Sequence, residues 1–163
     1  MKQDPAGIAA LDERIPFLLS QLGSLIADAF QARMRDVGTE PHTYAVLMAL
    51  ATRDGQSQRE LCAGLGIHRN AMVGIVDTLE AEGMAKRKTH PDDRRAFAVT
   101  LTDKARRLLP ELDQSARALE DEVTAPLSTV ERDVLRGLLQ RVAAGAGLIP
   151  GVHPGLLGGA VTR

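Results

Sequence analysis

The residues whose types and spacing could do chemistry lie in a central stretch between positions 57 and 101. After a Leu-Gly-Ile turn at 65–67, a predicted helix opens with an imidazole, a guanidinium and an amide, groups that hydrogen-bond to base edges and phosphates. Apolar side chains at spacings i, i+3, i+4 and i+7 assign one face of this helix to a core: Met72, Ile75, Val76 and Leu79. The opposite face, left free for a partner, carries the candidate contact residues His68, Arg69, Asn70, Val73 and Asp77, together with Gly74.

A charged hairpin is predicted after this helix. Between Met84 and Arg95 the chain has five Lys or Arg residues and two Asp residues, a local positive patch on a chain whose net charge is −1. An extended segment over 96–101 then follows a turn at about 90–93. The hairpin contributes the candidate DNA contacts Lys86, Arg87, Lys88, Asp93, Arg94 and Arg95. A helix presented by a neighbouring helix and followed by a basic hairpin fits a DNA groove and its backbone.

Each of these residues also has an ordinary structural explanation. Charged residues are common at hairpin tips, so Arg94 and Arg95 could form a solvated turn. The basic residues 86–88 could protect an exposed strand edge. Asn70 is a good helix-capping residue. The position of all these groups on one helix and the adjacent hairpin favours contact with DNA.

The composition argues against several other functions. One cysteine allows neither an internal disulfide nor a thiolate zinc cluster, and four widely separated histidines form no spaced metal-binding pair. No nucleophile–base pair or paired carboxylates stand out, so we expect no enzyme, no metal and no cofactor. Three Phe, one Tyr and no Trp argue against single-strand binding, in which bases stack on aromatic side chains. No apolar run approaches the roughly 20 residues of a membrane helix, and the N-terminus lacks signal-peptide order, so we expect a cytoplasmic protein with no membrane partner.

The rest of the chain is predicted to be helical. Periodic apolar residues indicate helices over about 11–36, 39–52, 57–65, 102–123 and 128–142, and Pro110 is expected to bend or break its helix. Ser-x-x-Glu capping boxes start two of them, at Ser57 and Ser128. The fold class is therefore mainly α with a small β-hairpin. Residues 39–101 would form the DNA-binding lobe, residues 11–36 and 102–147 a helical region whose apolar face calls for a second subunit, and residues 148–163 a flexible tail.

The order of these elements, with the run LCAGLGIHRNAMVGIVDTLEAEGMAKR and the following HPDDRRAFAVTLTDKA, resembles the MarR family of winged helix-turn-helix transcription regulators. The resemblance covers about residues 11–145 and falls on Gly66, Ile67, Val76, Asp77, Leu79, Glu80, Gly83, Arg87, Asp93, Arg95, Leu101 and Thr102. It implies an obligate homodimer held by the N- and C-terminal helices, with recognition helices in successive major grooves of a palindromic operator. Arg95, or Arg94 beside it, would enter a minor groove while Asp93 orients the hairpin.

The resemblance also implies a small-molecule effector. Effector pockets of this family form where the long helices meet the DNA-binding lobe, and the candidate lining residues for a phenolic or aromatic acid are Arg14, Phe17, His42 and Tyr44. Helix capping and core packing explain these four residues equally well. The chain departs from the family pattern at Val73 and Gly74, where relatives often carry Thr, Ser or Arg. Modest base readout is therefore expected, with DNA shape and backbone contacts supplying much of the affinity.

Taken together, these patterns predict a dimeric, sequence-specific DNA-binding repressor that an effector releases from its operator. Two other functions stay open. Cys62 could act as a redox sensor, although it lies on an apolar helix face without an evident cationic neighbour to lower its pKa. The winged helix could also bind protein, because the net charge is close to zero and Gly74 offers no side chain.

Overall fold

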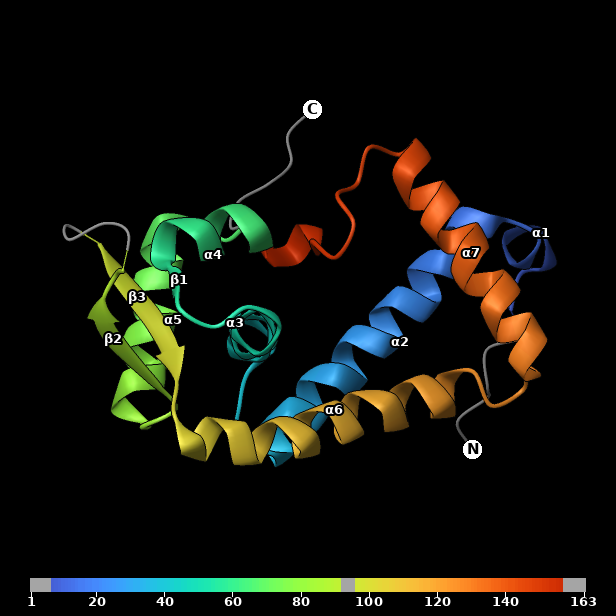
Figure 1. The fold of residues 1–163 in the computed structure, drawn as a ribbon. Coiled ribbons are helices and arrows are strands. Elements are labelled where there is room, and N and C mark those ends of the chain that lie inside the picture. The colour runs from blue at the N-terminus through green and yellow to red at the C-terminus, as the bar shows by residue number, and fades with distance from the viewer. Residues whose placement is uncertain (1–6, 92–95, 157–163) are drawn as a thin grey trace.

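The structure is a computed structural model that describes residues 7–91 and 96–156. The central helices and the sheet gather at one end of the molecule, and two long helices, α2 and α6, run side by side toward the other end (Figure 1). In chain order the elements are α1 (Ala9–Asp12), α2 (Ile15–Asp36), α3 (Pro41–Thr52), β1 (Gln56–Ser57), α4 (Gln58–Leu65), α5 (Arg69–Ala81), β2 (Ala85–Thr89), β3 (Phe97–Leu101), α6 (Asp103–Val123), α7 (Thr129–Gly145) and the 3-10 turn η1 (Pro154–Leu156). The mainly helical fold class with a small antiparallel sheet is confirmed.

The predicted first helix, 11–36, is divided in the structure. A short α1 ends at Asp12, Arg14 adopts an extended conformation, and α2 starts at Ile15 with Pro16 in its first turn. Proline has no amide hydrogen and its ring collides with the carbonyl four residues earlier, which disfavours one unbroken helix from α1 through Pro16 and suits Pro16 to the first turn of α2. Pro16 therefore begins the regular helix. Pro110 acts differently, because α6 continues through it from Asp103 to Val123 and no break occurs.

The sheet contains one more strand than the sequence predicts. Strands β2 and β3 pair antiparallel, with Ala85 opposite Leu101 and Thr89 opposite Phe97, and β1 pairs with the other edge of β3 to give the order β1-β3-β2. The carboxylate of Asp54, just before β1, accepts a hydrogen bond from the Leu101 amide at 2.9 Å. Two residues of strand carry too little periodicity to be recognised in a sequence. Their pairing depends on β3, more than 40 positions away.

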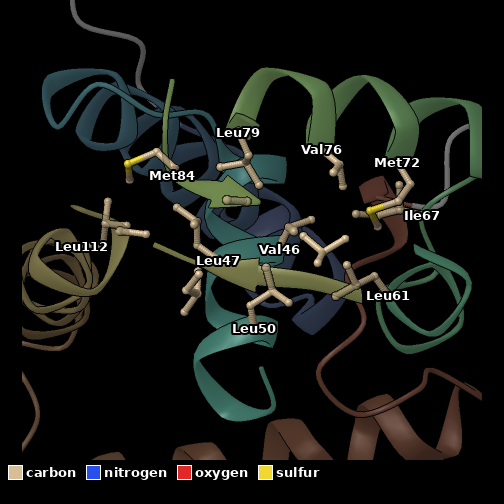
Figure 2. Packing of buried hydrophobic residues seen from close by; sticks show 14 of the residues in the cluster. Val46, Leu47, Leu50, Leu61, Ile67, Met72, Val76, Leu79, Met84 and Leu112 are labelled. Atoms are coloured by element: carbon tan, nitrogen blue, oxygen red, sulfur yellow. The ribbon is translucent and has the colours of Figure 1, made fainter. Parts of the chain in front are cut away.

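The hydrophobic core lies inside the lobe formed by α3, α4, α5 and the sheet, and reaches α6 at Leu112 (Figure 2). The predicted inward face of α5 is confirmed, because Met72, Val76 and Leu79 are fully buried and Ile75 packs half-buried against the same core. Leu47 and Leu61 meet them from α3 and α4. Between α4 and α5, Gly66 adopts a φ of 68°, a left-handed conformation that favours glycine. This core fixes the angle at which α4 presents α5.

The structure describes the segment predicted as a tail as far as Leu156, and this part of the chain forms turns. Gly147, with a φ of 74°, reverses the chain after α7, and the Leu148 amide donates to the Ala143 carbonyl at 3.0 Å, as in a Schellman motif. A further turn at 149–152 leads to η1, where His153 Nδ1 accepts from the Gly155 amide at 3.0 Å. The glycines and prolines that prevent a helix here form defined turns, which bring the chain back toward α4 (Figure 1).

Both predicted capping boxes are present, and the first allows a stability prediction. The Ser57 hydroxyl accepts from the Glu60 amide, and the Glu60 carboxylate accepts from the Ser57 amide at 2.8 Å. Hydrogen bonds from Ser57, first from its backbone, lower the pKa of Glu60. We expect Ser57→Ala to reduce the free energy of unfolding by about 1 kcal/mol. Since the folded pKa of Glu60 is depressed, its contribution is complete above the ordinary glutamate pKa and disappears as the pH falls through the lowered value.

Denaturant unfolding of both proteins across the acid range tests this expectation. Ser57→Ala should lose less stability than the parent protein as the pH falls. Because alanine keeps the backbone amide that bonds Glu60, two parallel stability curves would contradict only a role of the Ser57 hydroxyl in lowering the pKa of Glu60. Ser20→Ala, in the middle of α2, serves as the control serine that caps no helix.

Candidate nucleic-acid interface

The outer face of α5 carries the predicted contact residues in an exposed row. His68 precedes the helix as its N-cap, and its Nδ1 accepts a hydrogen bond from the Asn70 amide at 3.3 Å. The capping role considered for Asn70 therefore belongs to His68. Arg69 and Asn70 lie exposed in the first turn, and Val73 and Gly74 follow on the same exposed face. The first turn thus offers an amide and a guanidinium to a partner, while the middle of the helix offers one small apolar side chain.

Arg87 binds to α5, although the sequence analysis assigned it to DNA. From strand β2 its guanidinium reaches back to Asp77 at 2.6 Å and forms a second ion pair with Glu80. The Arg87 amide also donates to the Glu80 carboxylate at 2.7 Å. Burial opposes the charge of Arg87, but its hydrogen bonds and charge contacts with Asp77 and Glu80 outweigh this and raise its pKa. Arg87 and the two carboxylates therefore connect the hairpin to the recognition helix, and we refer to them as the Arg87 clamp.

Lys86 and Lys88 flank Arg87 on the same strand and are both exposed. Because successive side chains of a strand point to opposite faces, the two lysines project away from the Arg87 clamp. Asp93, Arg94 and Arg95 lie outside the described residues. The described part of the hairpin thus leaves Lys86 and Lys88 accessible to a phosphate backbone.

A polar groove beside α5 brings in residues that the sequence analysis did not select. It has a volume of about 550 Å³ and lies between the start of α4, the start of α5 and the hairpin. The side-chain nitrogen of Gln58 is buried in this region without a hydrogen-bond acceptor among the residues described. His90 Nε2 lies 3.8 Å from the Glu60 carboxylate and links the hairpin to α4. The groove is lined by Ser57, Gln58, Arg59, Glu60, Arg69, His90, Ala96 and Phe97. Gln58 and Arg59, polar residues in the first turn of the helix before the recognition helix, were the sequence signal that could have indicated this groove.

A second surface, far from this groove, is apolar. Helices α2 and α7 expose large hydrophobic side chains along their length, and a hollow of about 500 Å³ lies between α2, α6 and α7. Leu25 is 61% exposed and Leu138 is 48% exposed, so this protomer leaves them in water. We call this surface the apolar face; it consists of Ile15, Leu18, Leu19, Leu22, Leu25 and Ile26 on α2 and Val130, Val134, Leu135, Leu138, Leu139 and Val142 on α7. A continuous apolar surface of this kind marks an interaction site.

Comparison with known proteins identifies the family. The family model described as the MarR family matches residues 37–96, which span the lobe from the start of α3 into the hairpin. A probable transcriptional regulator from Pseudomonas aeruginosa is 31% identical, with a TM-score of 0.69, over 81% of this chain and 98% of its own. The repressor CouR bound to a 23-mer DNA duplex is 30% identical, with a TM-score of 0.74, over 86% of this chain and 99% of its own. This chain belongs to the MarR family of transcriptional regulators.

This MarR-family chain is also similar to a solved structure with a bound ligand and to a regulator compared by sequence. CouR from Rhodococcus jostii RHA1, in complex with p-coumaroyl-CoA, is 28% identical, with a TM-score of 0.70, over 83% of this chain and 96% of its own. A transcriptional regulatory protein for the hcr operon of Thauera aromatica is 32% identical over 105 residues, which is 64% of this chain. The chain spans 63% of the length of that relative. The winged helix-turn-helix fold is confirmed by the structures that match.

The four predicted effector residues of this MarR-family protein do not meet within one protomer. The Tyr44 ring packs edge-on against Phe30, with ring centroids 5.3 Å apart, and burial followed by the charge of Asp113 raises its pKa. Phe17 lies 13 residues before Phe30 on the same helix, about 20 Å away along its axis. Arg14 and His42 are exposed. Tyr44 is thus a core residue, and Phe17 lies at the opposite end of α2.

The environment of Cys62 disfavours a redox switch in this MarR-family chain. Cys62 is half-buried on α4, and burial raises the pKa of its thiol, while the charge of Arg69 opposes this only in part. A raised pKa means less thiolate at neutral pH, and the thiolate is the reactive form. We expect native Cys62 to react with iodoacetamide more slowly than free cysteine at pH 7.5, as measured by mass spectrometry. Fast alkylation of Cys62 in the folded protein would support the redox hypothesis. The alkylation rate of Cys62 in the denatured protein serves as the control, because the thiol is then fully exposed.

No helix in the described ranges 7–91 and 96–156 is both long and apolar enough to cross a membrane. The same ranges contain no group of three or more His, Cys, Asp or Glu side chains arranged to hold a metal ion.

Proposed function

We propose that this protein is a homodimeric repressor that binds a palindromic duplex operator through α5 and the hairpin, and that a small phenolic effector releases it. The observation that carries the proposal is the juxtaposition of the exposed first turn of α5 with two exposed lysines on a hairpin that the Arg87 clamp attaches to the same helix. A helix-turn-helix reads the major groove with the first residues of its second helix. Membership of the MarR family supports this reading, as does the complex of CouR with duplex DNA.

The apolar face supports the dimer. Its large side chains on α2 and α7 need a cover that this protomer does not supply, because removing exposed apolar surface from water is favourable. A symmetric partner presents the same surface, so α2 and α7 of two copies cover each other. The resulting two-fold axis requires a palindromic site with half-sites about 10–10.5 base pairs apart.

The effector class is supported by one relative. CouR binds p-coumaroyl-CoA, which carries a phenol on an acyl thioester, and the class predicted for this chain was a phenolic or aromatic acid. An effector acts by binding the DNA-competent arrangement less tightly than another arrangement of the two lobes.

The salt dependence of duplex binding tests the proposal. Selection of bound duplexes from a random pool supplies the ligand, and fluorescence anisotropy then measures affinity between about 50 and 200 mM salt. Each phosphate neutralised by a basic residue contributes a slope of about −0.9 to the plot of log affinity against log salt. Arg95→Ala should weaken binding to most duplexes and leave the dimer intact. Absence of duplex binding at low salt would overturn the proposal and favour a winged helix that binds protein.

A further inference from the structure

The outer face of α5 has no polar side chain at its second turn. Asn70, Gly74 and Asp77 follow one another at spacings of four and three, so they lie on one line along the helix, opposite the buried Met72. Val73 lies beside Gly74 and is 40% exposed. Between the Asn70 amide and the Asp77 carboxylate, the helix therefore presents the methyl groups of Val73 and the bare backbone of Gly74.

The polar groups next to this position are bound within the chain. The Asp77 carboxylate holds the Arg87 guanidinium at 2.6 Å. Thr78, one turn after Gly74, donates its hydroxyl hydrogen to the Gly74 carbonyl at 3.0 Å, and a threonine hydroxyl has no other hydrogen to donate. A base edge that faces the second turn of α5 therefore meets an apolar surface whose polar neighbours already have partners.

Nothing in the part of the chain that the structure describes requires a glycine at position 74. Its φ is not positive, so other residues can adopt its backbone conformation. A Cβ placed there would have open space around it, with no other described part of the chain within 4 Å. Glycine inside a helix is also less favourable than alanine, because its unfolded chain has more conformational freedom. A glycine that weakens the helix without relieving a clash inside the protomer indicates close approach by a molecule outside it.

The surface formed by Val73 and Gly74 fits one group in the major groove of DNA. The base edges in this groove carry hydrogen-bond donors and acceptors, and the C5-methyl group of thymine is their one apolar feature. An amino group of cytosine or adenine held against an apolar surface would lose its water without gaining a partner, which is unfavourable. The thymine methyl group instead gains an apolar contact with the Val73 side chain. An apolar surface on a recognition helix therefore selects thymine.

We propose that Val73 and Gly74 bind the C5-methyl group of one thymine in each half-site of the operator. The inference rests on the proposed function, in which α5 lies in the major groove, and it adds the base that the second turn reads. Val73 supplies the contact. The missing side chain at Gly74 lets the helix backbone come close enough for that contact to form. The exposed Arg69 and Asn70 then contact neighbouring base edges or phosphates from the first turn.

Replacement of thymidine by deoxyuridine tests the contact, because uracil pairs as thymine does and lacks only the methyl group. Duplexes selected from a random pool supply the ligand. Each thymidine of a half-site is replaced singly, and fluorescence anisotropy measures the affinity of the full-length protein. One position in each half-site should lose about fourfold in affinity, the value expected when one apolar carbon is no longer buried.

Two substitutions assign this effect to the second turn of α5. Val73→Ala should weaken binding to the thymine duplex and abolish the difference between thymine and uracil at the sensitive position. Gly74→Ala should do the same, since its methyl group holds the base edge away from Val73. Gly64→Ala, at an exposed glycine of α4 that likewise has open space around its Cβ in the described structure, is the matched control. It should bind both duplexes as the parent protein does.

Thermal unfolding separates this role of Gly74 from a structural one. Because alanine is the better helix former, Gly74→Ala should raise the melting temperature while it lowers duplex affinity. A glycine needed only for folding would give a lower melting temperature together with weaker binding, and that result would contradict the inference.

The deoxyuridine series also distinguishes the inference from the proposed function. The inference is overturned if no single deoxyuridine lowers the affinity, or if the sensitive position stays equally sensitive in Val73→Ala and Gly74→Ala. A protein that binds duplex with either of these results retains the proposed function and loses only the thymine contact. A protein that binds no duplex at low salt overturns both.

Discussion

Replacement of Arg87 by methionine is expected to lower duplex affinity at least about tenfold, or about 1.4 kcal/mol, and to destabilise the fold by about 1–2 kcal/mol. The guanidinium holds the hairpin against α5 through Asp77 and Glu80, and its side chain is only 21% exposed. Methionine keeps the apolar stem but leaves two carboxylates without their cation, one of them Asp77 on the proposed DNA-binding face. Both the position of the hairpin and the local charge then oppose DNA binding.

The salt dependence distinguishes the Arg87 clamp from a direct phosphate contact. If Arg87 positions the hairpin, Arg87→Met should reduce affinity at every salt concentration with little change in slope. A direct contact would reduce the slope by about 0.9. Lys88→Met, on the same strand and exposed, is the matched control and should reduce the slope without affecting stability. In the Arg87→Met background, Asp77→Asn should restore part of the lost affinity, because it removes an uncompensated charge. A reduced slope, unchanged stability and no rescue would instead make Arg87 a phosphate contact.

Replacement of Leu138 by glutamate is expected to convert the proposed dimer into monomers at micromolar concentration. Leu138 lies in the middle of the apolar face and is 48% exposed in the protomer, so the substitution leaves the fold of each chain intact. In the dimer the carboxylate would be buried without a partner, at a cost of several kcal/mol in each subunit. The loss of the second recognition unit should then reduce affinity for a palindromic duplex by about 100-fold or more.

Sedimentation velocity and duplex binding, measured together, test this second expectation. Gln31→Glu adds the same charge to an exposed position of α2 outside the apolar face and should leave both dimer and duplex affinity unchanged. A Leu138→Glu protein that remains a dimer would place the subunit interface elsewhere. A monomer that binds the palindromic duplex as tightly as the parent protein would show that a second subunit adds nothing to recognition.

Local sequence determined much of the helix-turn-helix and of the helices that flank it. The spacing of apolar residues was sufficient to orient α5, and Met72, Val76 and Leu79 are buried as predicted. Both capping boxes occur as expected, because a serine and a glutamate three residues apart can satisfy each other's amides without help from the rest of the chain. Most helix boundaries followed for the same reason, since hydrogen bonds between near neighbours define them, but the first predicted helix is divided before Pro16.

The division of the first predicted helix before Pro16 is a local effect, whereas the other exceptions depend on contacts between different elements. Arg87 looked like a phosphate contact because its partners lie ten and seven positions earlier on another element, and only the approach of β2 to α5 reveals them. Gln58, Arg69 and His90 line one groove only because the fold brings the starts of α4 and α5 next to the hairpin. Phe17 and Tyr44, grouped from the family pattern, are separated by more than half the length of α2, because Tyr44 packs on Phe30.

The sequence by itself therefore determined which residues of α5 face the core, where the capped helices α4 and α7 begin and that a basic hairpin follows the recognition helix, because these features depend on periodicity and local hydrogen bonds. Tertiary structure alone decided which charges remain available. An arginine is counted as positive in any sequence, but its charge reaches a partner only if no carboxylate of the same chain has already bound it. At Arg87 the fold supplies two such carboxylates. Long-range packing likewise left the Thr39 hydroxyl without a hydrogen-bond partner in the part of the chain that the structure describes, a feature that no local pattern encodes.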